Sequence, residues 1–234
     1  MQRPDDAEPP DRQDLRSRYR LLLTRGDSTD RTVFFSDAVF AIAMTLLVLD
    51  LEVPGGLPED QVGAALVGQL PHFLSFVLSF AVLGSAWLNH HRKFSVIVRY
   101  DFRLQVLNLL LLFFVALLPL PTTLLSEYGG ASSPWPVALY ATVVAGVYSM
   151  LNLVWAYAWR ARLMASVVDR DLYRYVLRAL LPVPLVFAAT IPLAFLVPGI
   201  AMFVWLLIIP ADIVVHRVIN APVAASPDGL PGAT

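Results

Sequence analysis

The chain has 234 residues, of which 57% are hydrophobic and 15% charged, and its mean hydropathy is +0.65. Soluble domains contain about 45–50% apolar residues, so this composition excludes an ordinary soluble domain and indicates an integral membrane protein. The net charge of −1 argues against a nucleic-acid partner, and the lack of cysteine excludes disulfides and thiolate metal sites.

In chain order, residues 1–30 are polar and charged and are expected to form a partly disordered cytoplasmic tail without a cleavable signal peptide. Apolar stretches follow, each long enough to cross about 30 Å of hydrocarbon as a helix. They cover approximately residues 33–51, 72–90, 104–125, 137–158, 176–197 and 199–216. We therefore expect an all-α, six-helix membrane domain over residues 31–218 and a disordered cytoplasmic tail over residues 219–234.

The basic residues follow a strict alternation along these stretches. All 17 Lys and Arg residues lie before the first stretch, between the second and third, between the fourth and fifth or just inside the fifth, or after the sixth. By the positive-inside rule, these segments and both termini face the cytoplasm. The opposite face receives acidic residues that either attract cations or are ordinary solvated loop residues: Asp50, Glu52, Glu59, Asp60 and Glu127.

The first stretch carries an apolar stripe with one hydroxyl. At 100° per residue, Leu46 and Leu49 each fall within about 40° of Ile42, with Phe35 and Thr45 close by. A stripe of this kind is most often a packing face, so periodicity alone is weak evidence for a pore.

Asp37 is the unusual residue of this stretch, because a charge inside hydrocarbon is costly. It points some 140° away from Ile42 on a helical projection, toward a packed neighbour, and there it needs a partner. The candidates near the same boundary are Arg31 or one of the polar residues that end the second stretch, Asn89, His90 and His91. Adjacent histidines point about 100° apart on a helix, so they do not readily bind one metal ion.

The motif R-x-x-x-F-S-D, formed by Arg31, Phe35, Ser36 and Asp37, precedes AIAMTLLVLDLEVP. Together with WLNHHRKF and NLLLLFFVALLPLPTTLL, it resembles the signature of the transmembrane protein 175 family, the endolysosomal potassium channel and its prokaryotic relatives. The resemblance implies a single six-span unit in the cell membrane of a prokaryote. It also implies a homotetramer in which the first helix of each subunit lines a central pore.

The resemblance further implies a potassium-preferring cation channel with a hydrophobic constriction in place of a carbonyl filter. Ile42 corresponds to the narrowest ring, Leu46 and Leu49 to rings further outward, and Thr45 to a hydroxyl layer. Arg31 and Asp37 are expected to brace the helices rather than touch the ion. No enzymatic activity, cofactor or resident metal is expected, and K⁺ and other monovalent cations are the permeant species.

A secondary transporter or a proton-coupled cation carrier is the alternative. Such a protein needs several ionisable groups deep within its spans. Beyond Asp37 and Asp212, which both lie near predicted cytoplasmic ends, the cores of the stretches hold no such group. The tryptophans, including Trp87 and Trp155, mostly lie near the ends of stretches, as residues of an aromatic belt do. Prolines in the third and fifth stretches predict kinks.

Overall fold

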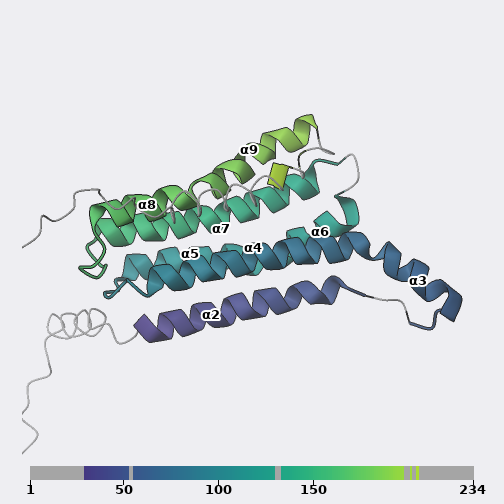
Figure 1. Cartoon of the computed structure of the whole chain (residues 1–234), viewed down its shortest axis with the longest axis horizontal. Coiled ribbons are helices and arrows are strands. Elements are labelled where there is room, and N and C mark those ends of the chain that lie inside the picture. Colours follow the sequence, from purple (N-terminus) through teal and green to yellow (C-terminus); the bar gives the residue numbers. More distant parts are fainter. Residues whose placement is uncertain (1–28, 53–54, 130–132, 198–200, 202–203, 206–234) are drawn as a thin grey trace, which may run out of the picture.

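The computed structural model describes residues 29–52, 55–129, 133–197, 201 and 204–205. Within these ranges the chain is helical apart from its connections, and the long helices lie side by side along one axis (Figure 1). The elements are α2 (Thr29–Leu46), the 3₁₀ turn η1 (Leu47–Asp50), α3 (Glu59–Gly68), α4 (Leu70–Phe94), α5 (Phe102–Leu117), α6 (Pro119–Tyr128), α7 (Trp135–Arg160), α8 (Arg170–Leu180) and α9 (Pro182–Leu196).

The described residues contain five segments that are long and apolar enough to cross a membrane. They are Arg31–Asp50, Leu70–Phe94, Phe102–Tyr128, Trp135–Arg160 and Arg170–Leu196. These segments agree with the first five stretches expected from hydropathy. The sixth expected stretch, residues 199–216, lies almost entirely outside the described residues, as do nearly all of the N-terminal tail and the whole C-terminal tail.

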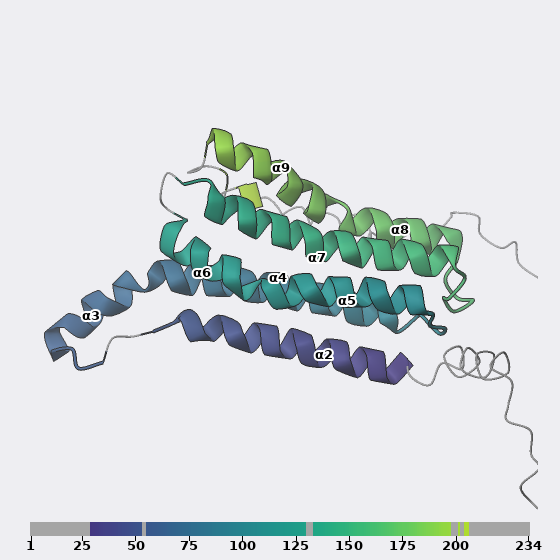
Figure 2. The same cartoon turned by 180° about the vertical axis from the view of Figure 1, so that it is seen from behind.

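Proline divides the third and fifth spans, as the sequence predicted. The third span breaks at Leu118, between α5 and Pro119 at the start of α6, and the fifth breaks at Leu181, before Pro182. Proline lacks the backbone N–H that would continue the helix, and its ring clashes with the preceding turn. Each break lets one span change direction and pack against two neighbours, and α6 turns onto α4 (Figure 2).

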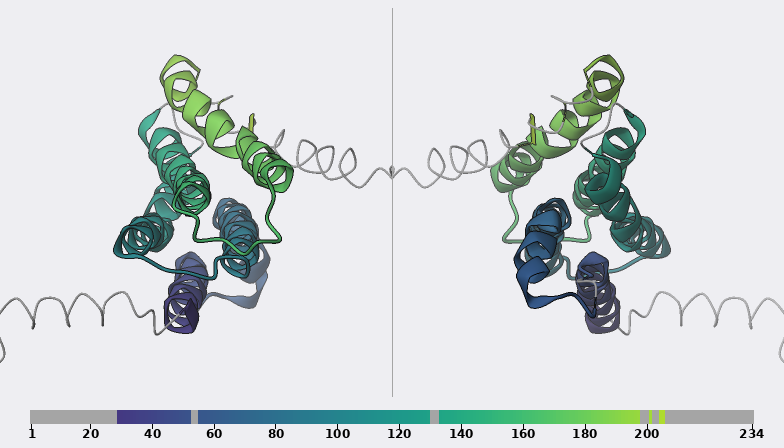
Figure 3. Two further views of the ribbon diagram at one scale, coloured as in Figure 1. Left: turned by 90° about the vertical axis from the view of Figure 1, so that its left-hand side faces the viewer. Right: turned by 90° about the vertical axis from the view of Figure 1, so that its right-hand side faces the viewer.

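The core centres on α7, which packs most extensively against α9 and α5. Gly146 allows this close approach, because an added Cβ would lie 2.5 Å from the Phe114 ring. Seen end-on, α2 lies at one edge of the bundle and α9 at the opposite edge (Figure 3). Among the elements that the structure describes, α2 therefore has neighbours on one side only.

The arginine-rich end of the bundle is closed by backbone hydrogen bonds. α7 ends in a Schellman motif, in which Leu163 N–H donates to the Ala158 carbonyl and Arg162 N–H to that of Trp159. Arg162 occupies the left-handed position with φ of 55°. Main-chain bonds then join the segments after α4 and α7: Val98 and Arg99 donate to the Leu163 carbonyl, and Ala165 donates to the Val96 carbonyl.

Candidate conduction pathway

One face of α2 is fully covered by its own subunit. Ser36, Phe40, Ala43 and Leu47 are each at most 1% exposed. Their spacing of three or four residues places them in one row along the helix, and this row packs against α4 and α5. The spacing of these four buried residues therefore defines the side of α2 that faces the bundle.

The opposite face of α2 holds the residues predicted to line a pore. Ile42 is 58% exposed, Leu46 43% and Leu49 65%, and Thr45 is exposed between them. The Thr45 hydroxyl donates to the Ile42 carbonyl at 2.8 Å, so its hydrogen is used within the helix and its oxygen faces outward. These side chains lie together on a surface that no described element of the same chain covers.

The end of the first span differs from the continuous α-helix predicted over residues 33–51. The α-helix stops at Leu46, and η1 continues as a 3₁₀ turn to Asp50. Because residues i and i+3 eclipse in a 3₁₀ helix, Leu49 stays aligned with Leu46 despite the tighter turn. Asp50 accepts a hydrogen bond from the Thr123 hydroxyl at 2.6 Å, which attaches this end to α6.

A buried chain of hydrogen bonds connects the F-S-D motif to two other helices. Asn108 on α5 donates to the Ser36 hydroxyl oxygen at 2.9 Å, and its own side-chain oxygen lies 3.0 Å from Nε2 of His90 on α4. Ser36 donates in turn to the Thr32 carbonyl at 2.8 Å. The His90 ring stacks on Phe94 at 4.1 Å between centroids. Because Ser36, His90 and Asn108 are all buried, the chain fixes the rotation of α2 relative to α4 and α5.

The structure corrects the expected partner of Asp37. The indole N–H of Trp87 donates to its carboxylate at 2.8 Å, so neither Arg31 nor the polar residues after Trp87 supply the observed bond. Trp87 therefore binds a neighbouring helix instead of serving simply as a belt residue. The other two motif residues, Arg31 and Phe35, are exposed.

The remaining candidates for Asp37 have separate contacts. Asn89 donates to the Ser85 carbonyl at 2.8 Å, and the exposed His91 ring lies 5.8 Å from the Trp87 ring. His90 faces the opposite way, into the bundle. Among the described residues, no group of three or more His, Asp or Glu side chains is placed to hold a metal ion.

Lys93 is a further buried polar residue, which the sequence places among the basic residues between the second and third stretches. It lies in the last turn of α4, is 3% exposed, and donates from Nζ to the Leu151 carbonyl of α7 at 2.8 Å. The ammonium also lies 5.8 Å from the centroid of the Trp155 ring, within the range of a cation–π contact. The sequence did not reveal the burial of Lys93, because this residue stands in a short run of basic residues, and such runs normally mark the solvated end of a span.

Comparison with known proteins identifies relatives of this chain. Residues 31–119 match the sequence model of the family described as the endosomal/lysosomal potassium channel TMEM175. A potassium channel of Streptomyces collinus is 42% identical over 135 residues, which are 58% of this chain and 63% of that protein. A potassium channel of Chamaesiphon minutus is 40% identical over 146 residues, covering 61% of this chain and 72% of its own length.

The fold has a counterpart among solved structures as well. The crystal structure of a lysosomal potassium-selective channel TMEM175 homolog from Chamaesiphon minutus superposes with a TM-score of 0.68 at 31% identity. The match covers 82% of this chain and 98% of that one. Sequence and structure agree, and the chain belongs to the TMEM175 family.

Proposed function

We propose that this chain forms a potassium-preferring cation channel in the cell membrane of a prokaryote. Four copies surround a central path, each contributing α2, and Ile42 forms the narrowest ring. Leu46 and Leu49 form wider rings toward one end, with the Thr45 hydroxyls between them. The names of the bacterial relatives support the activity, and the α2 geometry supports the route.

The observation that carries the proposal is the asymmetry of α2. One row of its side chains is locked into the subunit, while the row with Ile42, Leu46 and Leu49 is uncovered. A single helix cannot enclose a path, but a ring of symmetry-related copies can, since the same surface of each subunit faces the axis. An apolar ring passes ions when it is wetted and stops them when it dries.

Selectivity in such a neck follows from hydration. K⁺ holds its water less strongly than Na⁺, so K⁺ loses less when part of its shell is stripped at an apolar ring. We expect a modest preference for K⁺ because no ring of carbonyl oxygens replaces the lost water. The distribution of arginine supports an orientation with both termini in the cytoplasm and with Asp50 and its acidic neighbours at the outer mouth.

Ion flux from reconstituted liposomes tests this proposal. Vesicles that contain the wild-type protein should release K⁺ faster when loaded with K⁺ than they release Na⁺ when loaded with Na⁺. Ile42→Asn should raise the flux severalfold and reduce this preference. Leu185→Asn is a matched control, because Leu185 is 61% exposed on α9, on a different face of the subunit. Equal effects of the two substitutions, or no effect of Ile42→Asn, would contradict a neck at Ile42.

A secondary transporter or proton-coupled cation carrier remains the second candidate. Its support is Lys93, a buried ionisable group in the last turn of α4. A flux measurement at a clamped membrane potential and without a pH gradient distinguishes a channel from a coupled carrier. A channel continues to pass K⁺ down its own gradient, whereas a coupled carrier stops or moves a fixed number of protons per K⁺.

A further inference from the structure

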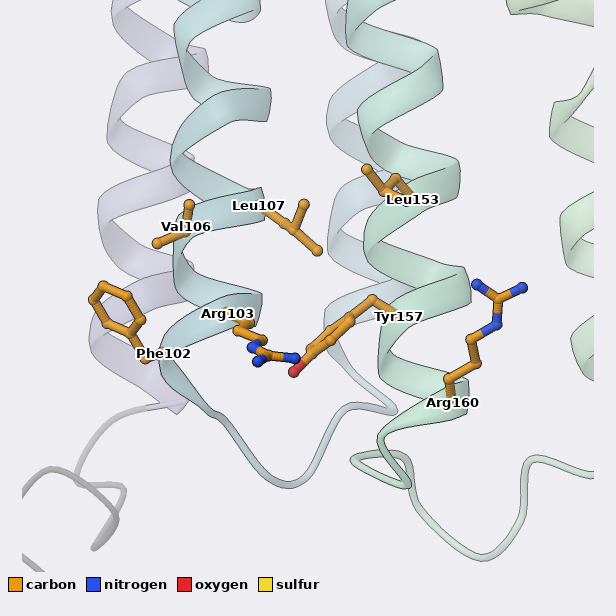
Figure 4. Close-up of a pocket in the computed structure, with 7 residues that line it drawn as sticks. All are labelled: Phe102, Arg103, Val106, Leu107, Leu153, Tyr157 and Arg160. Atoms are coloured by element: carbon orange, nitrogen blue, oxygen red, sulfur yellow. The ribbon is translucent and has the colours of Figure 1, made fainter. Parts of the chain in front are cut away.

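A groove between α5 and α7 lies at the arginine-rich end of the bundle and is not used by the proposed ion path. Its volume is about 420 Å³, within the range of ligand sites. Figure 4 shows Leu107 of α5 facing Leu153 of α7, with Val106 above Phe102 on the α5 side. Val106 and Leu153 are 38% and 42% exposed, so the groove opens toward the surroundings of the subunit.

Two guanidinium groups and one phenol complete the lining. Arg103 reaches toward the hydroxyl of Tyr157, whereas Arg160, in the last turn of α7, extends to the other side of that helix, away from Arg103 (Figure 4). The Tyr157 hydroxyl donates to Asp101 at 2.5 Å, and the other oxygen of this carboxylate accepts from Leu104 N–H at 2.8 Å. Both Asp101 oxygens are thus bonded, while neither arginine has an ion pair within the described part of the chain.

We propose that this groove binds one anionic phospholipid. An acyl chain lies along Val106, Leu107 and Leu153, the phosphate is bound by Arg103, and Arg160 adds positive charge at the same end of α7. The charge pattern supports this occupant, because two arginines without an ion pair among the described residues lie at the end of an apolar groove, at the level where a span meets the headgroups. Basic pockets between transmembrane helices are typical binding sites for anionic headgroups, and guanidinium groups match phosphate oxygens in geometry.

Native mass spectrometry of the full-length protein in detergent tests the proposal with phosphatidylglycerol and phosphatidylcholine as probes. The wild-type protein should retain phosphatidylglycerol in preference to phosphatidylcholine. Arg103→Gln/Arg160→Gln should weaken its binding by roughly thirtyfold, since each basic residue near an anionic surface contributes a factor of about five. Leu153→Trp, which fills the groove, should weaken binding of the same lipid while leaving both arginines in place.

The matched control is Arg170→Gln/Arg174→Gln on α8, which removes the same charge from exposed positions. Equal losses in both double variants would overturn the site, because they would reflect bulk electrostatics. No preference for phosphatidylglycerol in the wild type would overturn it too. A change in the mass of the assembly in Leu153→Trp would show that a second copy of the chain covers the groove. These readouts measure lipid retention, so they are independent of ion conduction.

Discussion

Replacing Asn108 with leucine probes how α2 is held in its orientation. Asn108 is 2% exposed and bonds both Ser36 on α2 and His90 on α4. The substitution keeps a side chain of similar size and removes both bonds. Ser36 keeps its bond to the Thr32 carbonyl. Nδ1 of His90 has no hydrogen-bond partner among the described residues, so the buried imidazole loses the one bond described for it.

The magnitude follows from these contacts. Interhelical hydrogen bonds in membrane bundles contribute about 0.6–1.7 kcal/mol each, and a buried polar group left without a partner adds about 1 kcal/mol. Asn108→Leu should therefore lower the free energy of unfolding by about 2–4 kcal/mol. The double variant His90→Phe/Asn108→Leu removes both polar partners and keeps a ring to stack on Phe94, so it should lose less than about 1.5 kcal/mol.

The measurement is a denaturant titration in mixed micelles, followed by tryptophan fluorescence, on the wild type, the two single variants and the double variant. The cycle gives the coupling energy between His90 and Asn108 directly. If the double variant is as unstable as the sum of the singles, the two side chains are not coupled, and the described chain of hydrogen bonds does not hold α2.

Three further predictions use the same unfolding assay. Lys93→Met should change stability by less than about 1 kcal/mol or increase it, because an apolar chain avoids burying a charge, whereas Lys93→Ala should cost about 2 kcal/mol or more. Trp87→Phe should cost about 1.5–3 kcal/mol by removing a bond to a carboxylate. That cost should vanish in an Asp37→Leu background, and persistence there would contradict the assigned pair. Gly146→Ala should cost about 1–3 kcal/mol because its methyl overlaps an α5 ring. Gly84→Ala, with open space around its Cα, should be neutral or stabilising, and the reverse order would refute the close α5–α7 packing.

The spans could be predicted from the sequence because hydropathy and length are local properties. The first five agree with the described helices, and the breaks at Leu118 and Leu181 follow from the prolines beside them. The change to a 3₁₀ turn after Leu46 could not be anticipated, because no glycine or proline marks it within the span.

Side-chain partners were predicted less well, since they depend on how distant helices are rotated. Ser36 and Asp37 stood out by their motif, but Asn108 lies 72 residues from Ser36, and Trp87 lies 50 residues from Asp37. Tryptophan near a span end fits an aromatic belt equally well, so the position of Trp87 did not reveal its bond to Asp37. Whether Ile42, Leu46, Leu49 and Thr45 line a path stays a prediction, because that depends on the neighbouring copies.

The backbone bonds between the segments after α4 and α7 have a mechanical consequence. Each main-chain bond contributes about 0.5–1.5 kcal/mol, so separating α4 from α7 at that end would cost several kcal/mol. These bonds make the arginine-rich end of the bundle stiff. The first span is joined to the other described helices by side-chain packing and by side-chain hydrogen bonds of Ser36, Asp37 and Asp50, with no main-chain bond to them among the described residues. Any displacement of α2 would therefore break side-chain contacts, while the main-chain bonds at the closed end would stay intact.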